Sequence, residues 1–343
     1  MNRLFLRPRE RQAPTRESPR ARRVGAFLGT GPAALERADA MEQWLGIALD
    51  AQTVFEPWDR RPDEIDRQFD RLEDIWAAGR VPLLTWEPFT PTPAATPSDL
   101  VPRAAAGGYD DYLTEFAAAL ADWVAGPDGE LDTADDRRCY LRPMHEANGD
   151  WYPWAPACAG FDPASYVRLW RRLHRIVADA GVPSDRVSWI WAINHVDVGD
   201  VPAESLFPGD GVVDLVGVDG FNWGATQPWS EWRSPDVVFG EALDRVQSLS
   251  DRPVCVPEFG STSVTVDGVD TGRKNDWLRD AFAYFRERDV ALAAYFDIEK
   301  ETDWQMFGGS HGGNTIRIDG RRYQTYPGFR AGIRAFVASD RPE

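Results

Sequence analysis

Short apolar runs alternate with helical patterns along most of the chain, and this alternation limits the possible folds more than any other feature. Eight of the runs have the length of buried strands: residues 24–27, 47–54, 81–85, 139–144, 187–192, 213–218, 253–256 and 290–296. Amphipathic helices are predicted between them. In residues 62–78, for example, Ile65, Phe69 and Leu72 recur on one helical face. Strands that alternate with helices in this way indicate a (β/α)₈ barrel, the TIM-barrel form of the α/β class.

The other predicted helices cover residues 33–45, 109–124, 163–180, 237–249, 272–288 and 326–337. Asp162 is a candidate N-cap for the helix that begins at Pro163. An open doubly wound sheet is the alternative fold. However, Gly25, Gly29 and Gly31 lack the G-x-G-x-x-G spacing that binds the phosphates of a dinucleotide. The barrel is therefore the predicted fold.

The chain of 343 residues suits one large domain, which we expect to span residues 24–338. Residues 1–23 are rich in Arg and Pro and show no periodicity, so they are predicted to form a disordered basic tail. The tail lacks the apolar core of a signal peptide. No apolar run reaches the roughly 20 residues of a membrane helix.

Composition narrows the possible partners. The formal net charge of −17 argues against nucleic acid or an anionic membrane as a ligand. Fifteen tryptophans hint at carbohydrate binding, although large cores also use this residue. Cys139, Cys158 and Cys255 sit at no metal-binding spacing and are predicted to be structural thiols, with a disulfide from Cys158 left open. The acidic stretch 128–136 lacks EF-hand spacing and is predicted to be a solvated turn.

Residues 139–154, CYLRPMHEANGDWYPW, carry the clearest chemical signal. An apolar strand ends in the carboxylate of Glu146 and opens into a loop that contains Trp151 and Trp154. Tryptophan faces stack on sugar rings, and a carboxylate beside them can transfer protons. A second carboxylate, Glu258, follows the apolar run 253–256. In a barrel the two could meet across the mouth, and a separation of about 5–5.5 Å suits retaining glycoside hydrolysis.

The sequences RPMHEANGDW and VPEFG resemble the acid/base and nucleophile motifs of glycoside hydrolase family 26, the β-mannanase family of a large retaining (β/α)₈ clan. The resemblance covers the chain from residue 24 to about residue 337. It implies that Glu146 is the general acid/base and Glu258 the nucleophile. It also implies that His145 lines the sugar site next to the cleaved bond and that Trp151 stacks on a sugar.

Two further positions are compared with the family. Trp304, after the eighth strand, resembles the sugar-platform tryptophan of the clan. Phe221, in the sequence DGFNW, departs from the pattern, because many relatives carry a tyrosine there that hydrogen-bonds the nucleophile. Phe221 cannot do this, so another residue must supply the contact, or the support is absent.

Other strand-end residues are candidates by position. Asn194, Phe221 and Trp223 are predicted to bind substrate, and His195 and Glu87 occupy similar places. The acidic run Asp297, Glu299, Glu301 and Asp303 is predicted to be mostly solvated. An alternative account treats Glu146 as a structural acid paired with Arg142.

The predicted function is endo-acting, retaining hydrolysis of a β-linked polysaccharide, with β-1,4-mannan as the first candidate substrate. A β-1,3/1,4-glucanase, a xylanase or a carbohydrate-binding pseudoenzyme on the same barrel are the alternatives. A metal-dependent hydrolase is disfavoured because the chain has only four histidines: His145, His174, His195 and His311. Double displacement needs no cofactor or metal. We expect a monomer, and a polymer substrate implies an extracellular enzyme, with the cytoplasm as the alternative.

Overall fold

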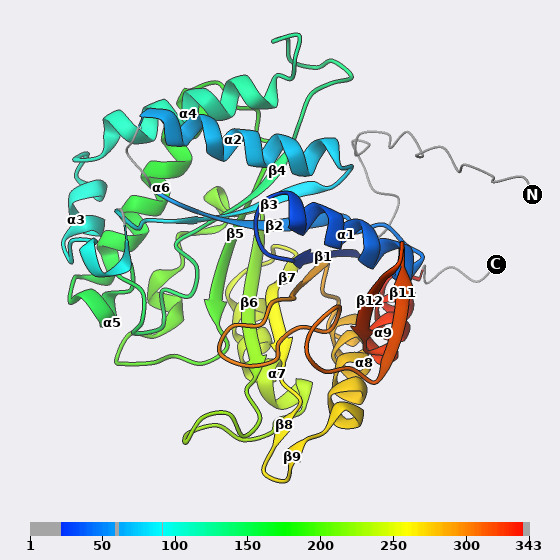
Figure 1. Ribbon diagram of the computed structural model, residues 1–343. Coiled ribbons are helices and arrows are strands. Elements are labelled where there is room, and N and C mark those ends of the chain that lie inside the picture. The colour runs from blue at the N-terminus through cyan, green and yellow to red at the C-terminus, as the bar shows by residue number, and fades with distance from the viewer. Residues whose placement is uncertain (1–21, 59–61, 91, 339–343) are drawn as a thin grey trace, which may run out of the picture.

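Eight parallel strands close into a barrel in the computed structural model, which describes residues 22–58, 62–90 and 92–338 (Figure 1). The strands are β1 (Arg23–Phe27), β2 (Ala51–Pro57), β3 (Val81–Glu87), β4 (Cys139–Pro143), β5 (Val187–Asn194), β6 (Leu215–Asn222), β7 (Val254–Ser261) and β10 (Leu292–Phe296). They neighbour one another in chain order, and β10 closes the barrel against β1. The predicted (β/α)₈ barrel is confirmed.

Helices pack around the outside of the strands (Figure 1). They are α1 (Pro32–Leu45), α2 (Pro62–Ala77), α3 (Leu100–Ala105), α4 (Asp110–Val124), α5 (Pro156–Ala159), α6 (Pro163–Asp179), α7 (Pro235–Leu249), α8 (Thr271–Glu287) and α9 (Pro327–Val337). Short 3₁₀ turns are η1 (Pro93–Ala95), η2 (Ala203–Leu206) and η3 (Asp210–Val212). The predicted cap of α6 is present, because the Asp162 side chain accepts a hydrogen bond from the amide of Ala164.

The strands run further toward their carboxyl ends than predicted. β5, β6 and β7 continue to Asn194, Asn222 and Ser261. The polar residues there suggested loops, yet their backbones still pair with neighbouring strands. The consequence is functional: side chains at the mouth of the barrel are held by strands as well as by loops.

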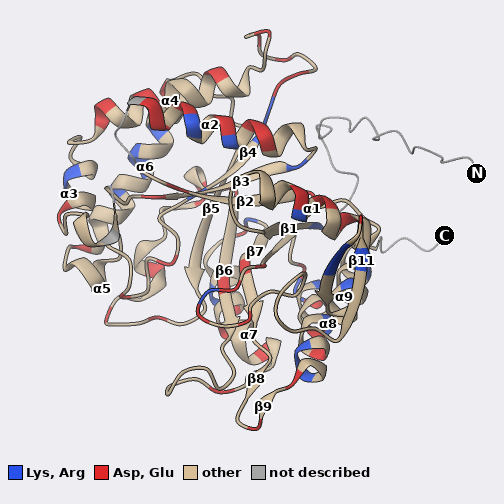
Figure 2. Ribbon diagram, in the orientation of Figure 1, with Lys and Arg blue, Asp and Glu red and all other residues tan. Residues whose placement is uncertain are grey.

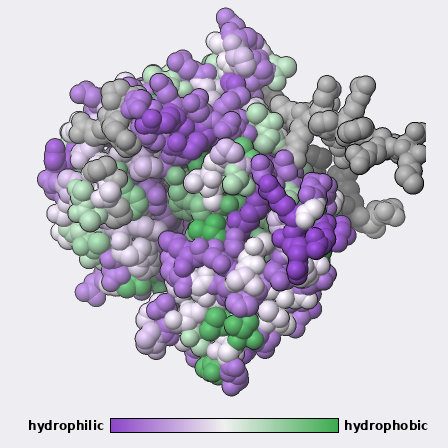
Figure 3. Space-filling view, in the orientation of Figure 1, coloured by the Kyte–Doolittle hydropathy of each residue, from purple (hydrophilic) through white to green (hydrophobic). Residues whose placement is uncertain are grey.

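Helices α3 and α5, the 3₁₀ turns and two hairpins were not predicted. Helix α3 begins inside the stretch 90–102, which was expected to be a loop. Two antiparallel hairpins join the barrel strands to later elements: β8 (Val264–Thr265) with β9 (Gly268–Val269), and β11 (Asn314–Ile318) with β12 (Arg321–Thr325). The β11–β12 hairpin contacts α1 (Figure 1). The β8–β9 tip forms a hydrophobic patch at the bottom of Figure 3, where Val266 is 88% exposed.

Most tryptophans serve the core. Trp58, Trp86 and Trp170 are fully buried, and Trp86 stacks on Phe116 at 4.0 Å between ring centroids. The high tryptophan count therefore reflects packing as well as the site. Cys139 and Cys255 are buried, Cys158 is exposed, and all three are free thiols.

The surface charge is mainly negative. Acidic side chains cover α1, α2 and α4 (Figure 2). In the turn 128–136, Asp136 accepts hydrogen bonds from the amides of Asp132 and Thr133 and pairs with Arg186 at 2.5 Å. Within the described residues, no cluster of three metal-ligating side chains is found, and no helix has the length and apolarity needed to cross a membrane. Most of the tail predicted for residues 1–23 lies outside the described part, and Arg23 already belongs to β1.

Candidate active site

Glu146 follows β4 on a tight turn at the mouth of the barrel. Its φ angle is 52° and that of Met144 is 51°, both in the left-handed region that non-glycine residues rarely adopt. The turn is held by a hydrogen bond from the Glu146 amide to the carbonyl of Ala192 on β5, at 2.9 Å. The backbone is thus fixed in an unfavourable conformation that sets the direction of this one carboxyl group.

The carboxyl group of Glu146 lies in a setting that favours its protonated form. It is buried, and its Oε2 accepts a hydrogen bond from Trp151 Nε1 at 3.1 Å. Burial, followed by the charge of Glu258, raises the pKa of Glu146 to about 8. Glu146 therefore holds a proton near neutral pH, which is what a general acid requires.

Glu258, on β7, has the opposite setting because it is paired with a buried guanidinium group. Arg142 Nη2 donates to Glu258 Oε2 at 2.7 Å, and the Nη1 group donates to both carboxylate oxygens of Asp219 at 2.8 Å. Arg142 Nε donates to Thr85 Oγ1 at 3.0 Å. Arg142 and Asp219 are fully buried. This direct contact with a charged donor distinguishes Glu258 from Glu146, whose donor is an uncharged indole.

This network answers two open questions from the sequence. Arg142 directs its donors to Asp219 and Glu258, and Glu146 is bonded to Trp151, so the structural pairing of Arg142 with Glu146 is not observed. Phe221 cannot donate a hydrogen bond to Glu258 as a tyrosine would. Arg142 donates a hydrogen bond to Glu258 instead. Phe221 packs instead against Trp304, with ring centroids 5.0 Å apart.

A cavity of about 910 Å³ contains both carboxylates on its wall. The predicted binding residues on the same wall are Trp151, Asn194, Phe221, Trp223 and Trp304. His145 is placed differently, because it lies behind Tyr152, whose hydroxyl is 3.1 Å from His145 Nε2. Burial lowers the pKa of His145, so its ring is neutral and positions Tyr152 at the cavity wall.

Trp304 forms part of the cavity floor. It is 1% exposed, and its Nε1 donates to Glu301 Oε2 at 3.0 Å. The segment that carries it is tied down by Lys274 of α8, whose buried ammonium group donates to the carbonyl oxygens of Trp304 at 3.2 Å and Gln305 at 2.9 Å. Trp304 is therefore held rigidly against the β-strands.

The prediction of a solvated acidic run after β10 is wrong for Asp297 and Asp303. Asp297 is fully buried, pairs with Arg37 and accepts a hydrogen bond from the amide of Met306 at 2.6 Å. Asp303 is buried and accepts a hydrogen bond from the amide of Ser263 at 2.9 Å. The two aspartates fix the loop around Trp304 and lie away from solvent.

Comparisons with known proteins show similarity to glycoside hydrolases. A family model described as glycosyl hydrolase family 26 matches residues 109–237. Endoglucanase H of Acetivibrio thermocellus is 29% identical to the chain over 293 residues, which is 83% of the chain. The chain is therefore similar to glycosyl hydrolase family 26. It spans only 29% of the length of Endoglucanase H.

Solved structures share the fold of this chain. The catalytic domain of a family 26 endo-β-1,4-mannanase from Bacillus sp. JAMB-750 superposes with a TM-score of 0.63 at 15% identity, covering 93% of the chain and 87% of that structure. A Bacillus subtilis mannanase gives a TM-score of 0.59 at 17% identity, covering 83% and 82%. A family 26 β-mannanase from Bacteroides ovatus gives 0.56 at 14%, covering 93% and 88%.

Sequence reasoning missed several residues that line the cavity. Tyr152, Trp229, Arg233 and Lys300 all line the cavity. The signal for Trp229 was present, because it follows the DGFNW motif in the same loop. Glu87, considered only for its position, ends β3 outside the cavity wall, where burial and then the charge of Glu258 raise its pKa to about 8.

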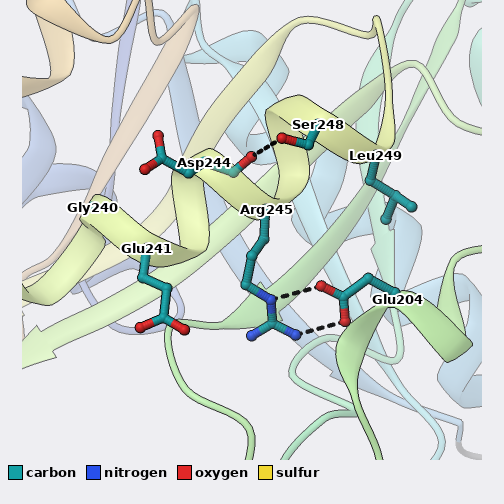
Figure 4. A pocket seen from close by; sticks show the side chains of 7 residues that line it. All are labelled: Glu204, Gly240, Glu241, Asp244, Arg245, Ser248 and Leu249. Atoms are coloured by element: carbon teal, nitrogen blue, oxygen red, sulfur yellow. Dashed lines mark hydrogen bonds and ion pairs between the residues drawn. The ribbon is translucent and has the colours of Figure 1, made fainter.

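A second hollow lies beside α7 and is lined by neither Glu146 nor Glu258; Figure 4 shows its lining residues. Its Arg245 side chain donates twice to Glu204 at 2.7 Å and once to Asp197 at 2.7 Å. The guanidinium group is already engaged with two carboxylates, so we interpret this hollow as a structural ion-pair site between α7 and η2.

Proposed function

We propose that this protein is an endo-acting, retaining glycoside hydrolase of β-linked polysaccharides. One observation carries the proposal: two carboxyl groups on one cavity wall have opposite environments. Glu146 is buried beside an uncharged indole donor, and Glu258 is bonded to a guanidinium group. One group is suited to donate a proton and the other to attack, which are the two roles of a retaining mechanism.

In the first step, a Glu258 oxygen attacks the anomeric carbon, and the bond to the leaving oxygen breaks as Glu146 protonates that oxygen. The product is a covalent glycosyl-enzyme. In the second step, Glu146, now a carboxylate, takes a proton from water while the water oxygen attacks the anomeric carbon. The bond to Glu258 breaks, and both carboxyl groups return to their starting states.

The substrate is proposed from two sources. The sequence motifs favour β-1,4-mannan, and the named mannanases share the fold at 14–17% identity. The greater identity, 29%, is to a protein named Endoglucanase H. We therefore test β-glucan first and β-mannan second. The match leaves 71% of Endoglucanase H uncovered, so the activity in its name need not belong to the matched part. A substrate assay is needed to distinguish β-glucan from β-mannan.

A carbohydrate-binding pseudoenzyme is the competing function. Phe221 favours this alternative, because it cannot donate a hydrogen bond to Glu258. Arg142 donates to Glu258, which weakens the argument from Phe221. We also propose that the protein is a monomer. Its polymer substrate suits action outside the cell, which we propose as its location.

The test is reducing-sugar release from barley mixed-linkage β-glucan, carob galactomannan and β-xylan by the wild-type protein and by Glu258→Ala. We expect release by the wild type alone. Azide should restore turnover of an activated aryl glycoside to Glu258→Ala and yield a glycosyl azide of inverted anomeric configuration. Glu146→Ala should lose activity on polymer but keep it on a dinitrophenyl glycoside, whose leaving group needs no proton.

Glu241→Ala serves as the control, because Glu241 is an exposed carboxylate on α7 beside the hollow of Figure 4. It should retain wild-type rates. Wild-type turnover by folded Glu258→Ala would refute the mechanism. Binding of a polymer without any release by the wild type would favour the pseudoenzyme.

A further inference from the structure

The loop between β6 and α7 presents an exposed tryptophan to solvent beside the cavity. Trp229 is 68% exposed, and it lines the same cavity as Glu146 and Glu258. An indole ring is among the largest apolar groups in a protein, and leaving it in water is unfavourable unless a partner covers it. The position of Trp229 at the rim therefore requires an explanation beyond packing.

The loop that carries Trp229 is held in place by hydrogen bonds at both ends. Asn222 Oδ1 accepts from the amide of Arg233 at 3.0 Å, and the Arg233 carbonyl accepts from Trp277 Nε1 of α8 at 2.8 Å. Next to Trp229, Ser230 Oγ donates to the carbonyl of Gly224 at 2.8 Å. The exposed indole is thus displayed by an ordered loop, which lowers the entropic cost of binding a ligand there.

The indole also continues a series of aromatic rings that begins at the cavity floor. Trp223 lies edge-to-face with Trp304 at 4.8 Å between ring centroids, and edge-to-face with Trp229 at 5.4 Å. Exposure rises along the series from the buried Trp304 through the half-buried Trp223 to Trp229. The aromatic surface leads from the two carboxylates outward to solvent.

We propose that Trp229 forms an outer binding subsite for a sugar ring of a β-linked polysaccharide, beyond the rings that contact Glu146 and Glu258. The ligand class rests on the proposed function. Sugar rings present apolar C–H faces that stack on indole, and their hydroxyl groups need polar partners. Glu231 and Arg233, which line the same cavity and pair with each other at 3.6 Å, supply a carboxylate and a guanidinium group.

The proposal has a consequence for substrate length. A chain long enough to reach Trp229 gains a contact that a short substrate cannot make. Removal of the indole should therefore weaken the binding and turnover of long chains and leave short substrates unaffected.

The binding test uses Glu258→Ala protein, which cannot turn over the polymer, with barley mixed-linkage β-glucan and carob galactomannan as probes in affinity electrophoresis and calorimetry. Adding Trp229→Ala should raise the dissociation constant for the bound polymer about ten-fold, the value of one aromatic contact. Trp229→Phe should recover most of the affinity. Val237→Ala is the control, because Val237 is 59% exposed on α7 and lies outside the cavity wall.

The kinetic test compares kcat/KM of the wild type and Trp229→Ala on an aryl glycoside and on oligosaccharides of increasing length. A loss confined to the longer substrates supports the subsite. Equal kinetics at every length, or an equal loss on the aryl glycoside, would overturn it. If the wild type cleaves no polymer but Trp229→Ala still weakens binding, the hydrolase proposal fails and the subsite stands. If neither probe binds to Glu258→Ala, the subsite is overturned.

Discussion

Replacement of Arg142 by methionine should cost both stability and turnover. Its guanidinium group is fully buried and bonds Asp219, Glu258 and Thr85 at 2.7–3.0 Å. Methionine replaces the unbranched stem of arginine but carries no guanidinium group, so the buried carboxyl of Asp219 loses its counter-ion. Breaking a buried pair from one side typically costs about 3–5 kcal/mol. That is a large share of the roughly 5–15 kcal/mol by which domains are stable.

The loss of unfolding free energy in Arg142→Met should depend on pH in a predictable direction. Burial already raises the pKa of Asp219, and without the guanidinium group the folded variant should keep this carboxyl protonated. The unfolded chain ionises it near pH 4. Because the unfolded state then binds fewer protons, the unfolding free energy of the variant should fall as the pH rises from about 4 to 7.

Urea unfolding followed by fluorescence measures the loss of unfolding free energy. Repeating the titration at several pH values measures its pH dependence. Arg279→Met is the matched control, because Arg279 is 50% exposed and its ion pair with Asp276 should contribute less than about 1 kcal/mol. If Arg142→Met does not fold, Arg142→Lys keeps the charge and should be partly active. A loss below 1 kcal/mol together with wild-type turnover by Arg142→Met would refute the role assigned to this network.

Two further predictions follow from buried titrating groups. Because Glu146 must be protonated to act as an acid, kcat on polymer should fall as the pH rises through about 8. The hydrogen bond from Trp151 favours the ionised form, so Trp151→Phe should move this limb of the pH–kcat profile to higher pH, and an unmoved limb would contradict the assignment. Burial lowers the pKa of Lys274 to about 8, against about 10.4 in the unfolded chain. The unfolded state therefore binds more protons between these values, and the contribution of Lys274 to stability should rise with pH across that window. In urea titrations Lys274→Met should lack this rise, and an identical pH dependence in both proteins would argue against a buried titrating lysine.

The barrel could be predicted because each of its strands and most of its helices can be recognised from neighbouring residues in the sequence. Each strand shows as a short apolar run and most helices as a 3.6-residue pattern, so the repeated unit is readable without knowledge of long-range contacts. The carboxyl ends of β6 and β7 were placed too early for the same reason. Polar residues such as Asp219 and Asn222 suggest a loop locally, whereas in the barrel they remain paired with the neighbouring strand.

Partners of charged residues could not be predicted, because they lie far apart in the sequence. Asp297 pairs with Arg37 across 260 positions, and Arg142 with Glu258 across 116. A run of acidic residues has the same local pattern whether it is solvated or neutralised by such distant cations. Loop tryptophans are ambiguous in the same way: the sequence places Trp154 and Trp229 in polar loops, yet the first is buried and the second exposed.

The difference between the two carboxyl groups arises from the direction of one guanidinium group. The charge of Glu258 raises the cost of ionising Glu146. In a symmetric pair of carboxyl groups, such repulsion favours one shared proton without deciding which residue holds it. Arg142 donates directly to Glu258, and Glu146 has only the neutral indole of Trp151. The charged donor stabilises an ionised partner more strongly than the neutral one does. The proposed mechanism therefore places the proton on Glu146. The proposed roles of acid and nucleophile both depend on β4, which carries Arg142 inside the barrel and leads into Glu146 at its mouth.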